Sequence, residues 1–369
     1  MRQLHKGRDP GELKERFADL LRSVSPEQIA MVEQTLIEEG LPRDQVMRLC
    51  DVHMSLFQEA LDRDKPLAPA GHPITILMAE HQALLDIADR LNQACKAGIT
   101  DQIPTLVSQI KDSANHYLRE ENVLFPHLER HGITEPPAIM WAERDKIRAT
   151  EKELCSLLGQ PGADPTGVSS ALYQLLSSHF YKENNVLFPM AMKVIGNEQW
   201  PSIRQEFDQV GYCGFTPRHI LIPIRQEPAH APSKNVTGQF EFDTGSLSLV
   251  ELQGILDNLP FDITFVDKDD SVRYFNQSKD RIFLRTKAVL GRKVQQCHPQ
   301  KSIHIVNQIL DEFRSGKRNV AEFWINLKGR LIYIRYVPVK DSAGQYLGCL
   351  EVTQDITHLK DLSREKRLL

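Results

Sequence analysis

An eleven-residue segment occurs twice in this chain and limits its fold more than any other feature. Residues 116–126 read HYLREENVLFP and residues 179–189 read HFYKENNVLFP, so seven of the eleven positions are identical. Each copy ends a long helical pattern with a proline that should kink the helix. An internal repeat of this kind indicates a repeated structural unit. We therefore expect two helical hairpins, related by approximate symmetry, that form a four-helix bundle over residues 70–212.

Each copy also places a histidine four residues before a glutamate. The pairs are His116 with Glu120 and His179 with Glu183, and this spacing puts both side chains of a pair on one helix face. A single such pair is more often a solvated ion pair. Two copies in matched contexts favour a metal site, because imidazole and carboxylate can together bind one metal ion or bridge two.

Further histidines fall near this pattern. His81 interrupts an apolar stripe on the first predicted helix, where a lone histidine is more often a hydrogen-bonded core residue, but beside the two His–Glu pairs it favours ligation. His127 and His131 are also four residues apart, and we interpret them as surface residues. His72 precedes Pro73 at the start of the first helix and is expected to cap that helix or to be exposed.

These residues resemble the hemerythrin-like, or HHE cation-binding, family. That family is a four-helix bundle with a non-haem di-iron centre, and its ligands are histidines and carboxylates. The resemblance implies a metal site that uses His81, His116, Glu120, His179 and Glu183.

The third predicted helix departs from the family pattern. It reads MWAERDKIRATEKEL, with Arg144 where the family has a histidine, and a guanidinium cannot ligate a metal ion. We expect Arg144 to face inward and to pair with Glu120 or Glu183, so that the site holds one iron or none. The fallback oxygen ligands on this helix are Glu143, Asp145 and Glu151.

Residues 1–66 are predicted to form an N-terminal helical domain of unknown function. Its first helix begins at Ser25-Pro26 and ends at Gly40-Leu41-Pro42, which are start and stop signals. The stretch VEQTLIEEGLPRDQVMRLCDVHMSLF resembles a domain that precedes hemerythrin-like and PAS domains in an uncharacterised bacterial family. Cys50 and His53 lie one helical turn apart, and we interpret them as a buried thiol beside a surface imidazole rather than as a metal or redox pair.

The last third of the chain has a different pattern. After a linker at residues 213–245, the order of a helix, a hairpin, two helical stretches and three β-rich runs predicts an α+β domain with an antiparallel sheet. Residues 246–362 resemble a PAS domain, which binds a small ligand or haem or serves in dimerisation. The candidate pocket residues alternate along the strands, although ordinary core packing explains most of them: Ile263, Phe265, Phe323, Ile325, Ile334 and Tyr336. Cys297 and His298 are weak candidates for haem ligands.

Charge and cysteine usage limit the function. A net charge of -4 gives no reason to expect nucleic-acid or anionic-membrane binding, and no apolar run approaches the roughly 20 residues of a membrane span. Six scattered cysteines without a CxxC pair fit a reducing cytoplasm. No hydrolase, kinase or transferase motif is visible, so we do not expect an enzyme.

The sequence therefore predicts a multidomain chain in which all-α N-terminal helices and a hemerythrin-like bundle precede an α+β PAS domain. Its predicted role is that of a cytoplasmic sensor of oxygen, nitric oxide or redox state, in which non-haem iron acts through the PAS domain on a protein partner, with a homodimer through the PAS domain. Two further roles stay open. One is a protein that handles iron, oxygen or nitric oxide directly or acts in repair. The other is a metal-free scaffold.

Overall fold

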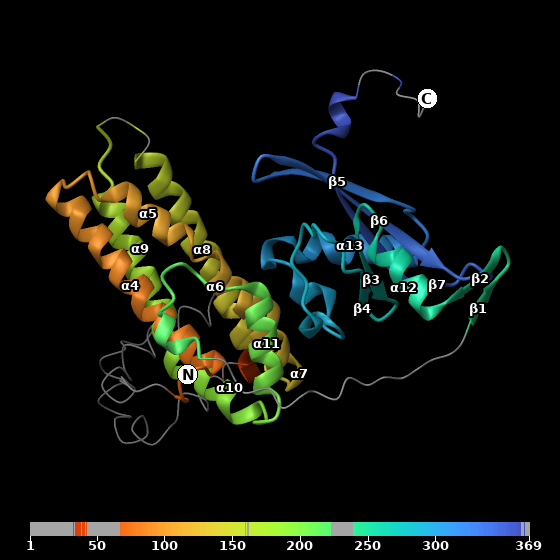
Figure 1. The fold of residues 1–369 in the computed structure, drawn as a ribbon, viewed down its shortest axis with the longest axis horizontal. Coiled ribbons are helices and arrows are strands. Elements are labelled where there is room, and N and C mark those ends of the chain that lie inside the picture. The colour runs from red at the N-terminus through yellow and green to blue at the C-terminus, as the bar shows by residue number, and fades with distance from the viewer. Residues whose placement is uncertain are drawn as a thin grey trace. The chain divides into compact units, whose positions relative to one another are not determined.

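The computed structural model describes residues 67–158, 160, 162–222, 239–362 and 365, with residues 32, 34–37, 39, 40 and 42. Most of the expected N-terminal domain, including Cys50 and His53, lies outside the described residues. The chain divides into two compact units, residues 1–226 and 227–369 (Figure 1). The first is helical and the second is α+β, so the expected fold class is confirmed.

Four helical arms make up the bundle (Figure 1). The first is α4 (Pro73–Ala97), and the third is α8 (Glu135–Leu158). The second arm consists of α5 (Ile103–Lys111), α6 (Ala114–Arg119), η1 (Glu120–Leu124) and α7 (Phe125–Arg130). The fourth consists of α9 (Thr166–Lys182), η2 (Glu183–Leu187) and α10 (Phe188–Val194), and it is followed by α11 (Trp200–Val210) and the short η3 (Arg218–Ile220).

Helix α4 has well-defined ends. At its start, His72 Nδ1 accepts a hydrogen bond from the Ile74 backbone N–H at 3.2 Å, so the expected capping role of His72 is confirmed. Pro73 occupies the first turn, where its missing N–H costs nothing. Gly98 ends the helix in the left-handed conformation, at φ 67°, which glycine adopts without strain.

The repeated motif forms the same local structure twice. Both η1 and η2 are five-residue π-helical turns, in which Phe125 N–H donates to Glu120 O and Phe188 N–H donates to Glu183 O. Each proline follows its π turn, within the first two residues of the next helix. A π turn inserted in an α-helix often marks a functional site, and here each one begins at the glutamate of a His–Glu pair.

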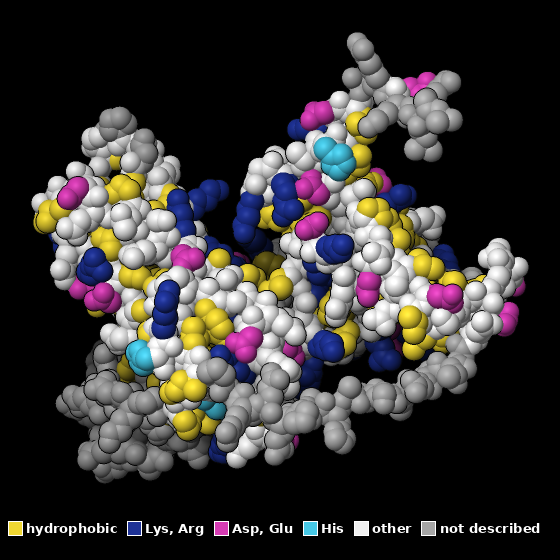
Figure 2. Space-filling model, viewed as in Figure 1, with side chains coloured by type: hydrophobic (Ala, Val, Ile, Leu, Met, Phe, Trp, Pro, Cys, Tyr) yellow, Lys and Arg dark blue, Asp and Glu magenta, His cyan; other side chains and the backbone are white. Residues whose placement is uncertain are grey.

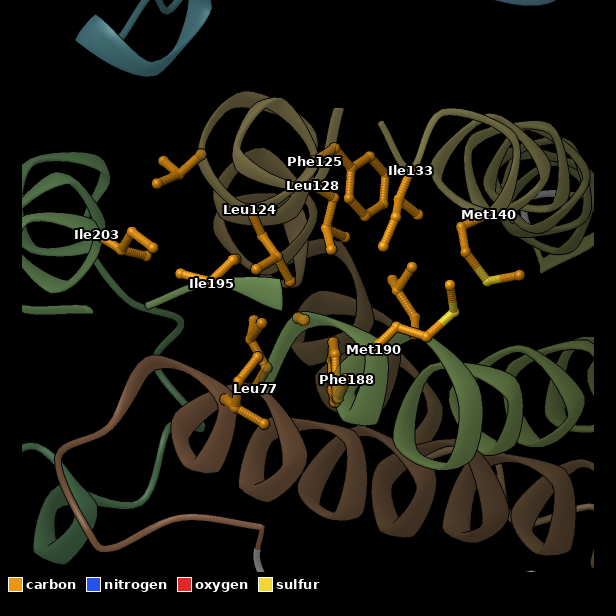
Figure 3. Packing of buried hydrophobic residues seen from close by; sticks show 14 of the residues in the cluster. Leu77, Leu124, Phe125, Leu128, Ile133, Met140, Phe188, Met190, Ile195 and Ile203 are labelled. Atoms are coloured by element: carbon orange, nitrogen blue, oxygen red, sulfur yellow. The ribbon is translucent and has the colours of Figure 1, made fainter. Parts of the chain in front are cut away.

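Two buried apolar clusters fill the bundle, and His81 lies between them along α4. The first cluster contains Leu77 of α4. Figure 3 shows that side chains of η1, α7 and α10 point into the same cluster, including those of Leu124, Leu128 and Phe188. The second cluster begins at Leu84, one turn beyond His81. Polar side chains between the two clusters are therefore shielded from solvent on both sides.

The second unit contains a five-stranded antiparallel sheet with the order β4-β3-β7-β6-β5. Helix α13 packs against β6 and β7, and a capping box of Ser248 and Glu251 begins α12. The hairpin of β1 and β2 precedes α12. The strands and helices are β1 (Gln239–Phe242), β2 (Gly245–Ser248), α12 (Leu249–Asp257), β3 (Asp262–Asp267), β4 (Val272–Phe275), η4 (Lys287–Val289), η5 (Val294–Cys297), η6 (Gln300–Ser302), α13 (Ile303–Arg314), β5 (Ala321–Leu327), β6 (Arg330–Lys340), β7 (Tyr346–Asp355) and η7 (Leu359–Asp361).

No helix in the described part of the chain combines the length and the apolar character that a membrane crossing requires.

Candidate metal centre

Four side chains from different parts of the bundle meet between the two apolar clusters. They are His81 of α4, His116 of α6, Glu120 of η1 and Glu183 of η2. One ligand atom from each lies within 4.8 Å of the others, and all four residues are buried. The sequence predicted this group, because the stripe of α4 and the two repeated motifs put these residues on inward faces.

The spacing within the group suits a metal ion. The Nε2 atoms of His81 and His116 are 3.2 Å apart, and His81 Nε2 lies 3.2 Å from Glu183 Oε2. His116 Nε2 lies 3.6 Å from Glu120 Oε2. Bonds of about 2.0–2.2 Å to a shared cation would place neighbouring ligand atoms roughly 3.0–3.5 Å apart.

His179 lies at the edge of this group. Its Nε2 atom is 3.3 Å from Glu183 Oε1, the second oxygen of a carboxylate that also faces His81. The side chain of His179 is 2 % exposed. The structure therefore brings all five sequence-predicted ligands together, with His179 on the side of Glu183 away from the four-residue group.

Each of the three histidines donates a hydrogen bond from Nδ1, the ring nitrogen that faces away from the centre, to a side-chain oxygen. A metal-binding histidine is usually oriented in this way, which fixes the tautomer and leaves Nε2 free to ligate. The pairs of Nδ1 and oxygen are His81 with Asn184 at 2.8 Å, His116 with Glu80 at 2.7 Å and His179 with Glu143 at 3.2 Å.

Three buried oxygens at the centre accept no hydrogen bond. They are Glu120 Oε1 and both carboxylate oxygens of Glu183. Burying a carboxylate without a partner for its charge is costly, so these atoms favour a bound cation. Burial disfavours a charged His81, but the adjacent carboxylates of Glu120 and Glu183 outweigh that effect and raise the pKa of His81 to about 9. For His116, burial dominates and lowers the pKa, which favours the neutral form that ligates metals.

Arg144 is buried, as expected, but its predicted partner is wrong. The guanidinium pairs with Glu151 on its own helix, with Nη1 and Oε1 3.2 Å apart, and not with Glu120 or Glu183. Its Cζ atom lies 3.2 Å from the centre of the Tyr117 ring. The cation–π contact with Tyr117 and the ion pair within α8 thus hold Arg144 in place of the expected contact with the centre.

The remaining acidic and histidine candidates lie outside the four-residue group. Glu143 accepts a hydrogen bond from Lys182 Nζ at 2.6 Å in addition to its contact with His179. Asp145 pairs with Arg148 at 3.4 Å. His131 is exposed, but the interpretation of His127 as a surface residue is wrong, because it is only 5 % exposed.

Glu80 is a functional candidate that the sequence did not reveal. Its side chain is buried, and it contacts both His116 and Arg119. Burial favours its neutral form, but hydrogen bonds and attraction from His116 and then Arg119 outweigh burial and lower the pKa of Glu80 to about 2. Glu80 directly precedes His81 and so lies about 100° around the helix from the apolar stripe; helical periodicity gave no signal for it.

The α+β unit contains a mostly apolar cavity of about 200 Å³ between α13 and the sheet. Of the predicted pocket residues, Phe323, Tyr336 and His298 line it. Its polar groups include Glu351, which is 9 % exposed and accepts a hydrogen bond from Thr353 Oγ1 at 3.2 Å.

The other predicted pocket residues lie elsewhere. Val266 lines the cavity, so Ile263 and Phe265 point to the opposite face of β3, because side chains alternate along a strand. Ile325 and Ile334 share the sheet face of the cavity but do not line it. Cys297 packs at the edge of the apolar core of this unit.

Comparisons with protein families agree with this division of the chain. Three family models match: a family of unknown function (DUF438) at residues 1–63, the hemerythrin HHE cation-binding domain at residues 72–191, and a PAS domain at residues 252–357. The chain joins a DUF438 region, a hemerythrin HHE domain and a PAS domain. The resemblance seen in the sequence is thereby confirmed, and the cluster of histidines and glutamates lies within the HHE domain.

Solved structures are similar to about a third of the chain. A C-terminal domain from Streptococcus mutans is 37% identical, and the match covers 34% of this chain and 98% of that one, with a TM-score of 0.33. The PAS domain of Bordetella pertussis BvgS is 23% identical over 30% of this chain and 87% of that one, with a TM-score of 0.25. A PAS domain from Colwellia psychrerythraea is 19% identical over 30% and 98%, with a TM-score of 0.24. No curated protein matches the chain.

Proposed function

We propose that the HHE domain binds one non-haem iron ion and that the chain acts as a sensor of oxygen, nitric oxide or redox state. The ligands are His81, His116, Glu120 and Glu183. One observation carries this proposal: three buried carboxylate oxygens without a hydrogen-bond donor lie beside histidine Nε2 atoms at ligand spacing. A cation is the partner that satisfies this set of atoms.

Iron fits the chemistry of the ligands. Imidazole and carboxylate together suit iron among the first-row metals. When bound, iron would supply reversible binding of a diatomic gas or a change of redox state. The residues around it hold the histidine rings and keep out water, since His81 stacks between Phe180 and Phe188, with ring centres 4.0 and 5.4 Å away.

The number of iron ions follows from α8. In place of a histidine, this helix presents Arg144, whose positive charge is buried beside Tyr117. A guanidinium cannot ligate a metal ion, so this position of α8 contributes no ligand to a second ion. His179 then serves beside Glu183 as an outer partner.

For the output, we propose that the PAS domain changes its interaction with a protein partner or with a second copy of the chain. The cavity beside α13 would hold a small apolar ligand. On the face shown in Figure 2, Lys and Arg side chains are interspersed with Asp and Glu, which supports a protein partner over nucleic acid. Among the residues that the structure describes, Cys95, Cys155, Cys213, Cys297 and Cys349 form no disulfide bond, which supports a cytoplasmic location.

A metal-free scaffold is the second candidate, because the His81 ring lies against both buried carboxylates of the centre. A protonated His81 lies near both Glu120 and Glu183 and offsets part of their charge. Its single positive charge cannot compensate two buried carboxylates, which is why we prefer the metal site.

Iron content per chain after anaerobic purification tests the proposal. We expect about one iron ion per chain. A protein that is purified without metal and does not bind added Fe²⁺ would support the metal-free scaffold. Exposure of the ferrous protein to oxygen and to nitric oxide then distinguishes a sensor from a protein that handles these gases or acts in repair. A reversible spectral change supports sensing, whereas continuous consumption of the gas supports handling or repair.

A further inference from the structure

The segment of residues 211–222, here called the connector segment, follows α11 and precedes the PAS domain along the chain. Although the sequence predicts a linker from residue 213, this part packs against the bundle. Cys213, Thr216 and Ile220 are each about 5–6 % exposed. Gly214 N–H donates a hydrogen bond to the Asp112 carboxylate, between α5 and α6.

One side chain of the connector segment reaches the surroundings of the metal centre. Thr216 Oγ1 donates a hydrogen bond to Glu80 Oε1 at 2.5 Å. The other oxygen of the same carboxylate, Oε2, accepts from His116 Nδ1 at 2.7 Å and from Arg119. Thr216 is therefore two hydrogen bonds away from a metal-ligating ring, and Glu80 and Arg119 are at most 1 % exposed.

We propose that Thr216 is a positioning residue of the metal centre, so that the connector segment is part of the site and is held more firmly when metal is bound. This inference rests on the proposed metal binding. It adds a physical link between the state of the centre and the stretch of chain that leads to the PAS domain.

Glu80 links Thr216 to the His116 ring. Without the Thr216 hydroxyl, Glu80 Oε1 would be a buried acceptor with no donor, and only the hydrogen bonds to Oε2 would hold the carboxylate. The His116 ring would lose part of its orientation. Loss of an outer partner of this kind typically weakens metal affinity by about 10- to 100-fold. Linkage is reciprocal, so metal that binds better to the docked segment must favour docking by the same factor.

The first test compares three variants of the full-length chain. Thr216→Val removes the hydroxyl and keeps the shape, and Thr216→Ser keeps the hydroxyl. Thr75→Val is the matched control, because Thr75 is also buried and donates its hydrogen bond to Ala68 O at 2.7 Å, away from the ligands. Affinity for Fe²⁺ is measured anaerobically in competition with a chelator.

We expect Thr216→Val to bind Fe²⁺ about tenfold more weakly, and Thr216→Ser and Thr75→Val to bind within about twofold of the wild type. Hydrogen exchange gives an independent reading. Fe²⁺ should slow exchange in residues 213–220 of the wild type by roughly tenfold, and this protection should be reduced in Thr216→Val.

Contrary results have distinct meanings. If the wild type binds Fe²⁺ and Thr216→Val binds equally well, the positioning role is wrong and the proposed metal site stands. The positioning role is also wrong if Thr75→Val weakens binding as much as Thr216→Val does, or if metal leaves exchange in residues 213–220 unchanged. A wild type that binds no metal overturns the proposed function and this inference with it.

Discussion

Glu120 and Glu183 set the energetics of the centre, because both are at most 1 % exposed. A buried carboxylate is stable only if its charge is compensated nearby. Protonated His81 compensates one negative charge, whereas a bound dication compensates two. Metal binding should therefore stabilise the bundle and should depend on each histidine that faces the carboxylates.

The substitution His116→Ala should remove most bound iron. Its Nε2 atom lies 3.2 Å from that of His81, so the variant loses one of the ligands that define the centre. We expect iron per chain to fall at least about tenfold, measured by elemental analysis. His131→Ala is the control, because His131 is exposed, and its iron content should match that of the wild type. Equal loss in both variants would contradict the assignment.

The substitution Arg144→His should raise iron content from about one toward about two ions per chain. It replaces the buried guanidinium on α8, which cannot ligate a metal ion, with an imidazole that can. Arg148→His is the matched control, since Arg148 lies one turn further along α8 with a side chain that is 40 % exposed and pairs with Glu121. A wild type that already holds two irons would show that Arg144 does not limit the site.

The cap of α4 should make stability sensitive to acid. Burial lowers the pKa of His72 to about 4, below its value of about 6.5 in an unfolded chain. The unfolded state therefore takes up the proton first, and His72 lowers stability as pH falls from about 6.5 to about 4. His72→Asn keeps a good capping side chain without a titrating group. Its unfolding free energy, from denaturant titrations, should fall less over this range, and an unchanged slope would contradict the argument.

At the residue scale, the sequence predicted which side chains point inward better than it predicted their partners. His81 and the two His–Glu pairs could be predicted because helical spacing determines which face a residue occupies. The partner of Arg144 could not, because Tyr117 and Glu151 compete with the centre for the guanidinium. Such a competition depends on distances across the bundle, which spacing along one helix does not contain.

At the scale of elements, the repeat predicted two equivalent helical arms but not their shape. A proline was expected to kink each helix, whereas the structure places a π turn before it. The π turn is an insertion of one residue in the hydrogen-bond ladder, and the sequence pattern of apolar residues does not mark it. In the PAS sheet, alternation was predicted, but the choice of face for β3 was wrong for Ile263 and Phe265. Both faces of that strand carry apolar residues, so the pattern alone did not decide.

The packing of α9 gives a prediction about bundle stability. Leu176 is fully buried in the second apolar cluster, and Leu→Ala in a core typically costs about 2–5 kcal/mol. Leu176→Ala should lower the unfolding free energy of the bundle by that amount. Leu175→Ala, one residue away and only partly buried, should cost less, as measured by denaturant titration. An equal cost for both would mean that the cluster does not depend on the inward face of α9.

At the scale of the whole molecule, the chain consists of two units with separate cores. The apolar clusters of the bundle contain residues from 74 to 207, and that of the PAS domain contains residues from 266 to 349. The sequence predicted this division because the hydrophobic period changes from helical to alternating after residue 245. It did not predict that residues 213–222 pack on the bundle, because Pro217, Pro223 and Pro228 and the lack of a sustained period are typical of a linker.

Two cores should give two unfolding transitions, and metal should affect only one. A ligand that binds the folded state at about 100 times its dissociation constant adds about 2.7 kcal/mol of stability. Adding Fe²⁺ anaerobically should therefore raise the transition temperature of the bundle, and a chelator should lower it again.

Phe313 is fully buried in the PAS core, so Phe313→Ala should lower the unfolding free energy of the PAS domain by about 3–5 kcal/mol and thereby identify the second transition. Calorimetry measures both. A single transition that shifts both with metal and with Phe313→Ala would show that the two units unfold together. If metal shifts only the transition that Phe313→Ala lowers, the metal site lies outside the bundle.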